Sequence, residues 1–339
     1  MALEYPKIDV HAHYLPEVYR EYYLKYGPTT PDGMPGWWDW DADDHLKMAD
    51  SLNITKSYLS VTSPGVRLVP GDDELARDLA RKVNVAGAEV KRAHPDRFGL
   101  FLSLPLPDVE SSLGELAYGM DHLDADGVVV LTNGDGYYLG HQRYEPLWAE
   151  LDRRAAVVFI HPTTGRIVES TVDSPEGNSS RPVAPLPEYA NPIFEFFFDT
   201  TRAVINLFYT GAIARYPNIK YIVAHAGACL PPLIQRFAEL ARIHQPMTVD
   251  ASVSPDFVKE RLRRQFFFDL AGFPFPDQLR GLLPFVGADQ ILYGTDYSPA
   301  TADEVRRLAG IMAEYLPVIF NKEEQEMVYS KNAERLFQK

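Results

Sequence analysis

Residues 8–16 read IDVHAHYLP, an apolar run that ends in two histidines one residue apart and is followed by a proline. Side chains two positions apart in a strand point to the same side, so His11 and His13 can reach a single ion at the end of this strand. A pair of this kind can equally be two hydrogen-bonded polar residues at a strand end. Its meaning therefore depends on the runs that follow it in the chain.

Seven further runs share the apolar character of the first. Nearly continuous apolar residues are typical of parallel strands that are covered on both faces. The eight runs are Ile8–His11, Ser57–Val61, Phe98–Leu104, Gly127–Leu131, Ala156–His161, Lys220–His225, Gln265–Leu270 and Gln290–Gly294.

Longer amphipathic segments alternate with these runs. In the clearest of them, Asp72–His94, acidic residues come first and apolar residues recur at spacings of three and four, as in a helix. Eight strands with intervening helices predict an α/β fold, a (β/α)8 TIM-type barrel, as a single domain over residues 1–339. An open doubly wound sheet is the alternative, but the Gly-rich loop of its nucleotide-binding form does not follow the first run. The other helix-like segments are Tyr144–Arg154, Thr200–Ala214, Pro231–Ile243, Pro276–Val286, Ala302–Tyr315 and Lys322–Gln338.

Two segments interrupt this alternation. Gly27–Trp40 is rich in Pro, Gly and Trp, and Thr163–Asn191 holds several prolines among small polar residues. They follow the first and fifth strands, so we expect long loops there, at the C-terminal face of the barrel. Active sites of this fold lie at that face.

Three more runs end in residues that bind metals or transfer protons. AVVFIHP ends the fifth run at His161, YIVAHAG ends the sixth at His225, and ILYGTD ends the eighth at Asp296. Because a barrel gathers its strand ends around one axis, these side chains should meet the first histidine pair. Imidazoles with one carboxylate suit a divalent ion, with Zn²⁺ as first choice and Mn²⁺ or Fe²⁺ as alternatives.

The composition is that of an ordinary globular protein. Of 339 residues 46% are hydrophobic, and the formal charge of −14 repels nucleic acid and anionic membranes. No run reaches the roughly 18 to 20 apolar residues of a membrane span, and we find no signal segment at the start. The single cysteine, Cys229, allows no internal disulfide, which fits a reducing compartment. We therefore expect a cytoplasmic protein without nucleic-acid or membrane partners.

The other candidate residues have two interpretations each. Asn133, just after the fourth strand, is either a substrate contact or a turn residue. Cys229 precedes the apolar residues LPPL, which favours a buried, unreactive thiol. Two aromatic groups are either pocket lining for a planar ring or packing residues: Trp37, Trp38 and Trp40, and Phe194, Phe196, Phe197 and Phe198. Five histidines lie beside charged residues and are expected at the surface: His45, His94, His122, His141 and His244.

The order of the strand-end residues resembles the amidohydrolase superfamily. The segments FDTTRAVINLFYTG and DLAGFPFPDQL are most similar to 6-methylsalicylate decarboxylases. The resemblance implies a metal-dependent carboxy-lyase that converts an ortho-hydroxybenzoate-like acid to CO₂ and a phenol. A broader resemblance covers nearly the full length of the chain. It is to the branch that contains aminocarboxymuconate semialdehyde decarboxylase and the nonoxidative aromatic acid decarboxylases. The segments that carry it are IDVHAHYLP, HPDRFGLFLSLPLPD, DGVVVLTN, VVFIHPT, YPNIKYIVAHAGACLPPLIQR and ILYGTDY.

Carried over by position, the resemblance assigns roles to single residues. The metal ligands would be His11, His13, His161 and Asp296. Asp296 would also donate the proton, and His225 would orient or recharge it. Arg236 would bind the substrate across a homodimer interface, with an ordinary surface arginine as the alternative.

Two departures from the resemblance narrow the substrate. Gly27–Trp38 holds no arginine, whereas the muconate enzymes bind a carboxylate with one there; this argues against aminocarboxymuconate semialdehyde. Resorcylate and carboxyvanillate decarboxylases carry glutamate where this chain has His11. The alternative activity is a hydrolase or hydratase in which His225 takes a proton from an activated water. A binding barrel without activity is the third possibility.

Overall fold

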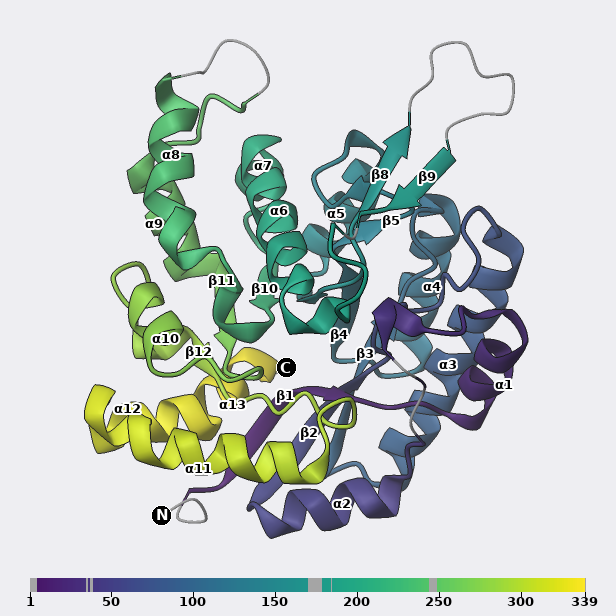
Figure 1. The fold of residues 1–339 in the computed structure, drawn as a ribbon, viewed down its shortest axis with the longest axis horizontal. Coiled ribbons are helices and arrows are strands. Elements are labelled where there is room, and N and C mark those ends of the chain that lie inside the picture. The colour runs from purple at the N-terminus through teal and green to yellow at the C-terminus, as the bar shows by residue number, and fades with distance from the viewer. Residues whose placement is uncertain are drawn as a thin grey trace.

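The computed structural model describes residues 5–34, 36, 39–169, 179–183, 185–243 and 249–338. Eight parallel strands form one sheet in the order β1-β2-β3-β4-β7-β10-β11-β12 (Figure 1). Each predicted run overlaps one of these strands, and the predicted (β/α)8 barrel is confirmed. The strands are β1 (Lys7–His13), β2 (Ile54–Ser60), β3 (Phe98–Ser103), β4 (Gly127–Leu131), β7 (Val157–His161), β10 (Lys220–Val223), β11 (Phe266–Asp269) and β12 (Ile291–Leu292).

The two ends of the sheet meet between β1 and the segment after β12. The backbone N–H of Val10 donates to the carbonyl of Tyr293 at 3.0 Å. One residue further along β1, the carbonyl of His11 accepts from the N–H of Asp296 at 2.8 Å. This seam closes the barrel and places the eighth strand end directly beside the first.

The barrel interior is filled by apolar side chains from alternate positions of the strands. At the N-terminal end, Phe337 of α13 (Asn332–Phe337) stacks on Tyr58, with 3.8 Å between the ring centroids. The interior is therefore a packed core, and the candidate ligands lie above it at the C-terminal mouth. The buried interior residues are Ile8, Val10, Tyr58, Phe101, Val129, Val157, Phe159, Ile222, Ala224, Phe267, Leu292 and Ala333.

Helices cover the outside of the barrel (Figure 1). In the longest, α3 (Asp73–Ala93), the side chain of Asp72 caps the first turn by accepting from the N–H of Leu75 at 3.0 Å, and an apolar face packs inward. The others are α4 (Val109–His122), α5 (Glu145–Arg153), α6 (Glu195–Tyr209), α7 (Ala212–Arg215), α8 (Ile234–Ile243), α9 (Pro255–Gln265), α10 (Asp277–Leu282), α11 (Ala302–Ile319) and α12 (Lys322–Glu326).

The sequence pattern did not indicate α4 or α9. The α4 segment contains two glycines and two serines, which are weak helix formers, and α9 buries only a narrow stripe of its mostly charged residues. Packing on the barrel supplies the stability that the local pattern lacks.

The predicted long loops follow β1 and β7, and the segments after these two strands contain structure that the sequence pattern missed. The segment after β1 holds two helices, α1 (Glu17–Tyr26) and α2 (Ala42–Ser51), with the predicted loop between them. After β7, β8 (Arg166–Glu169) and β9 (Ser179–Pro182) pair antiparallel. A smaller pair, β5 (Asn133–Gly134) and β6 (Tyr137–Tyr138), follows β4. Trp37 and Trp38 lie outside the described residues.

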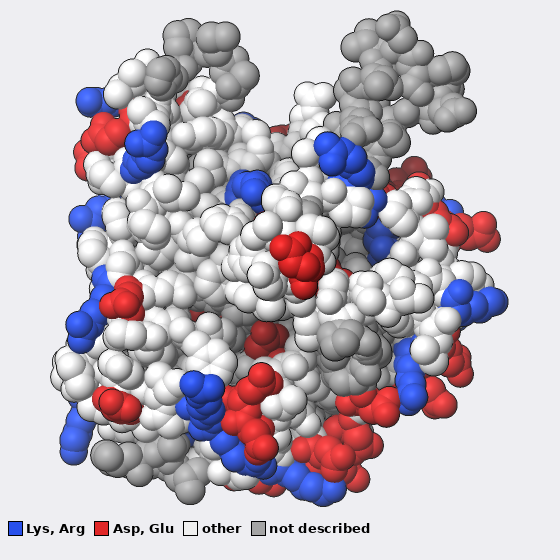
Figure 2. All heavy atoms as spheres, in the orientation of Figure 1, with Lys and Arg blue, Asp and Glu red and all other residues white. Residues whose placement is uncertain are grey.

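The surface carries charges of both signs. On the face shown in Figure 2, Lys and Arg side chains lie among Asp and Glu side chains. Within the described ranges, the helices are too short or too polar to cross a lipid bilayer.

Candidate metal centre

Four side chains from three strand ends converge at the mouth of the barrel. His11 and His13 come from β1, His161 from β7, and Asp296 from the turn after β12; one ligand atom of each lies within 4.8 Å of the others. The Nε2 atoms of His11 and His13 are 3.2 Å apart. Asp296 Oδ1 lies 3.1 Å from His13 Nε2 and 3.4 Å from His11 Nε2. The structure thus brings together all four predicted ligands.

Each imidazole uses its other nitrogen outside the centre. His11 Nδ1 lies 3.0 Å from Asp269 Oδ2, and His161 Nδ1 lies 2.7 Å from the carbonyl of Pro162. His13 Nδ1 contacts Ser60, at 3.1 Å from its hydroxyl and 3.3 Å from its carbonyl. Carboxylate and carbonyl oxygens only accept here, so Nδ1 carries the proton and Nε2 keeps its lone pair. Lone pairs that face one another at 3.2 Å fit one divalent metal ion between them.

The electrostatics of the centre favour a cation. Burial alone would raise the pKa of Asp296, but His11, His13 and His225 hold that pKa well below its usual range, so the carboxylate stays ionised. Burial, with His13 and His11 nearby, holds the pKa of His161 well below its usual range, so this imidazole is neutral. An ionised carboxylate and a neutral imidazole are the forms that bind metals.

His11 is the point at which two carboxylates act together. Burial opposes a charge on its ring, yet Asp269 and Asp296 raise the pKa of His11 to about 10. Both carboxylates therefore favour positive charge at His11 Nε2: a proton there supplies it when no ion is bound, and a divalent ion would replace that proton and bind the freed lone pair.

Two buried carboxylates that the sequence analysis did not select support the centre. Asp269, at the end of β11, contacts His11 through Oδ2 and accepts from the backbone N–H of His225 at 3.1 Å through Oδ1. Asp9 accepts from the N–H of His11 at 3.1 Å and from the hydroxyl of Thr295 at 2.6 Å. The strand-end criterion that selected Asp296 would also have found Asp269, because it is the second-to-last residue of the seventh run and the last residue of β11.

His225 lies beside the four candidate ligands, two residues after the end of β10. Its Nε2 is 3.4 Å from Asp296 Oδ2, while Asp296 Oδ1 faces the β1 histidines. The side-chain amide of Gln278 donates to the carbonyl of His225. The ring of Phe197 stacks on the imidazole at a centroid distance of 5.6 Å and an angle of 20°. The imidazole is thus fixed where a proton can pass between it and Asp296.

Neither predicted substrate contact is among the residues of the metal centre, although Asn133 lines a neighbouring cavity. The Asn133 amide donates to Asp199 Oδ2 and to the carbonyl of Thr164, both at 3.1 Å, and its oxygen accepts from the N–H of Gly136. Its side chain is thus held in a network beside the mouth. Arg236 is the third residue of α8 and is exposed. A substrate role stays a prediction for both residues.

His45 corrects one expectation about the surface. It is fully buried, accepts from Trp40 Nε1 at 3.2 Å and packs edge-on against Tyr297. Burial lowers the pKa of His45 to about 3, so the ring is neutral. The neighbouring charged residues misled the prediction, because they occupy the opposite side of α2. His122 and His141 are exposed as predicted, His94 is half-buried, and His244 lies outside the described residues.

Cys229 and the phenylalanines take intermediate positions. The Cys229 thiol is half-buried rather than fully buried, and burial raises its pKa. Phe196 is buried and approaches His161 edge-on, with 6.5 Å between the ring centroids. Phe198 is 44% exposed. Because Phe197 stacks on His225, the phenylalanine cluster belongs partly to the core and partly to the wall of the metal centre.

Comparisons with known proteins place the chain in a family. Residues 8–339 match the Amidohydrolase family model. The 6-methylsalicylic acid decarboxylase of Penicillium expansum is 35% identical over 315 residues, which cover 91% of this chain and 90% of that protein. Among solved structures, an amidohydrolase II has a TM-score of 0.84 and 30% identity, covering 98% of this chain and 100% of its own. A dihydroxybenzoic acid decarboxylase from Polaromonas sp. JS666, with bound manganese and the inhibitor 2-nitroresorcinol, has a TM-score of 0.75 and 21% identity and covers 98% and 97%. The chain belongs to the amidohydrolase family.

Proposed function

We propose that the chain is a metal-dependent, nonoxidative decarboxylase of an ortho-hydroxybenzoate-like acid of the 6-methylsalicylate type. The observation that carries this proposal is the position of Asp296. One of its carboxylate oxygens lies beside the histidines of β1, and the other lies beside the imidazole of His225. The similarity to the Penicillium expansum enzyme, whose name states its substrate, supports the same class of acid.

The residues that would hold the metal are His11, His13, His161 and Asp296. A divalent ion bound there would neutralise the substrate's carboxylate and phenolate charges. We propose Zn²⁺ first, because three of the four donors are imidazole nitrogens, and Mn²⁺ as the alternative. We also propose a cytoplasmic location and a single domain over residues 1–339.

In the reaction, a proton adds to the ring carbon that bears the carboxylate. The bond from that carbon to the carboxyl carbon then breaks, its electron pair returns to the ring, and CO₂ leaves. Asp296 Oδ2 is placed to relay this proton: the carboxylate is ionised at rest, so it would take the proton from His225 Nε2, 3.4 Å away, and pass it to the ring carbon. Asp269 and Gln278 hold the backbone of His225, and Phe197 holds its ring.

Isotope labelling tests the decarboxylase against the hydrolase or hydratase. With a panel of hydroxybenzoates in D₂O, we expect CO₂ release and one deuterium on the ring carbon that carried the carboxylate. The alternative enzyme would transfer ¹⁸O from labelled water to its product, because water is then the nucleophile. Mass spectrometry distinguishes the two products. ¹⁸O in a ring-opened or hydrated product without CO₂ would rule out the decarboxylase.

We further propose a homodimer in which Arg236 of one subunit serves the site of the other. Arg236 is exposed on α8, and a planar guanidinium can bind a carboxylate through two hydrogen bonds, which lysine cannot imitate. Arg236→Ala and Arg236→Lys should both lose activity and keep the metal.

Mixed dimers test this sharing. An Arg236→Ala chain mixed with a His161→Ala chain should regain part of the activity, because one site of the mixed dimer is whole. Arg242→Ala, at the exposed end of the same helix, is the matched control and should stay active. Full activity of Arg236→Ala, or no recovery in the mixture, would make Arg236 a surface residue only.

A further inference from the structure

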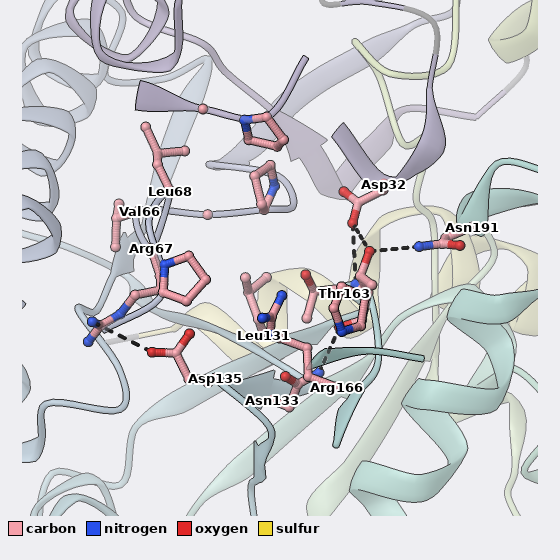
Figure 3. Close-up of a pocket in the computed structure, with 18 of the residues that line it drawn as sticks. Asp32, Val66, Arg67, Leu68, Leu131, Asn133, Asp135, Thr163, Arg166 and Asn191 are labelled. Atoms are coloured by element: carbon pink, nitrogen blue, oxygen red, sulfur yellow. Dashed lines mark hydrogen bonds and ion pairs between the residues drawn. The ribbon is translucent and has the colours of Figure 1, made fainter. Parts of the chain in front are cut away.

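A cavity of ≈ 580 Å³ lies at the C-terminal mouth of the barrel, on the side of β2, β3, β4 and β7 (Figure 3). The segments that follow five strands supply most of its lining, as active-site loops do in this fold. Pockets of about 300 to 1,000 Å³ suit small organic ligands, so a single methyl group would fill little of this one. The main lining residues fall within segments 26–33, 61–70, 103–106, 129–135 and 163–166.

The cavity adjoins the candidate metal centre, although none of the four candidate ligands lines it. Leu131 of the cavity wall is paired with His161 in the sheet, and paired strands lie about 4.8 Å apart. Val61, also in the wall, directly follows Ser60, which contacts His13. The cavity therefore lies beside two strands whose ends hold or contact candidate ligands.

Part of the cavity wall is aliphatic. These side chains offer no hydrogen-bonding group, so they favour hydrocarbon over water or a polar ligand. The aliphatic lining residues with little or no exposed surface are Val61, Val66, Leu68, Leu104, Leu106, Val129 and Val130.

Hydrogen bonds between loops hold the cavity in shape. Asp32, in the segment after β1, accepts from the N–H and the hydroxyl of Thr164, after β7. The Asn191 side chain donates to the Thr164 hydroxyl at 2.7 Å, and the hydroxyls of Ser63 and Thr163 are 2.7 Å apart. A cavity that is formed in advance does not spend binding free energy on ordering its loops.

Charged groups line more than one side of the cavity: Asp32 and Arg166 belong to the lining, as do Arg67 and Asp135. Figure 3 shows Arg67 and Asp135 across the cavity from Asp32 and Asn191. Arg67 donates to Asp73 at 2.6 Å and to the carbonyl of Leu106 at 3.2 Å, and it lies 3.7 Å from Asp135. Hydrocarbon packed against these ions would remove water from them at a cost, so they set a limit to the length of an apolar ligand.

We propose that this cavity binds an aliphatic substituent of the aromatic acid, longer than a methyl group, while the acid's carboxylate and phenolate face the metal centre. The inference rests on the proposed decarboxylase function and names its substrate class: hydroxybenzoates with an alkyl chain of several carbons on the ring. Each methylene that leaves water should raise affinity about fourfold, until the alkyl chain reaches the charged groups of the lining.

Two homologous series test the proposal on the metal-loaded full chain. One consists of salicylates with methyl, propyl, pentyl or heptyl chains at the ring carbon next to the carboxyl or opposite it. The other replaces their carboxylate with a nitro group, which cannot leave as CO₂, so calorimetry measures binding without turnover. In at least one position, kcat/KM of the acids and affinity of the nitro compounds should rise with chain length and then level off.

Filling the cavity should reverse this preference. Val66→Trp should lower kcat/KM for the heptyl acid on the order of tenfold relative to the methyl acid, because the larger side chain would exclude two or more methylenes from the cavity. Leu104→Phe should act in the same direction. Val318→Trp is the matched control, because Val318 is 70% exposed on α11 and does not line the cavity.

The outcomes separate this inference from the proposed function. Acids decarboxylated equally well at every chain length would overturn the cavity proposal and leave the decarboxylase standing. Nitro compounds that bind more tightly with length, without any acid being decarboxylated, would support the cavity and overturn the decarboxylase. If Val66→Trp and Leu104→Phe keep the preference for long alkyl chains, the alkyl group binds elsewhere and the cavity proposal is overturned.

Discussion

His161→Ala is expected to lower bound divalent metal from about one ion per chain to almost none and to abolish turnover. The substitution removes one of four donors that lie within 4.8 Å of one another. The remaining donors include two imidazoles from the same strand, which cannot surround the ion without the opposite side of the barrel. Elemental analysis of purified protein, together with CO₂ release, measures both effects. His11→Ala should behave in the same way.

Graded variants make this prediction specific to the centre. Asp269→Asn should weaken metal binding by about tenfold to a hundredfold, because Asp269 orients His11 without being one of the four donors. His122→Ala, at an exposed position, is the matched control and should bind metal fully. Full occupancy in the double variant His11→Ala, His161→Ala would refute the assignment of the ligands.

His225→Asn is expected to lower kcat by about 10² to 10⁴ while metal content stays near one ion per chain. His225 Nε2 faces Asp296 Oδ2 at 3.4 Å and is not among the four donors. Asparagine retains polarity and approximate size but cannot exchange a proton in the neutral pH range, so only the proton path should fail.

Metal content and turnover measured on the same sample distinguish a role of His225 in proton transfer from a role as a metal ligand. His94→Asn, a half-buried histidine at the end of α3, serves as control and should retain kcat. Unchanged kcat in His225→Asn would exclude His225 from proton transfer. A parallel loss of metal would instead place it among the ligands.

The local pattern of the sequence determined the barrel and the identity of the candidate ligands. A strand covered on both faces needs a nearly continuous apolar run, and this requirement is visible in eight short segments without knowledge of their neighbours. His161 and Asp296 end two such segments, and a barrel gathers strand ends at one mouth. The position of each residue at the end of its own segment, together with the convergence of strand ends in a barrel, was therefore sufficient to predict that the two residues meet.

Contacts between distant segments were decided by the tertiary structure alone. Asp269 orients His11 across 258 positions of the chain, and Asp32 reaches Thr164 across 132. His45 is buried because it packs against Tyr297, although its sequence neighbours are charged. The cavity, with its aliphatic and charged lining residues, draws most of its wall from five separate segments. Such features depend on which surfaces meet after folding, and a periodic pattern records only the face that each segment buries, not its partner.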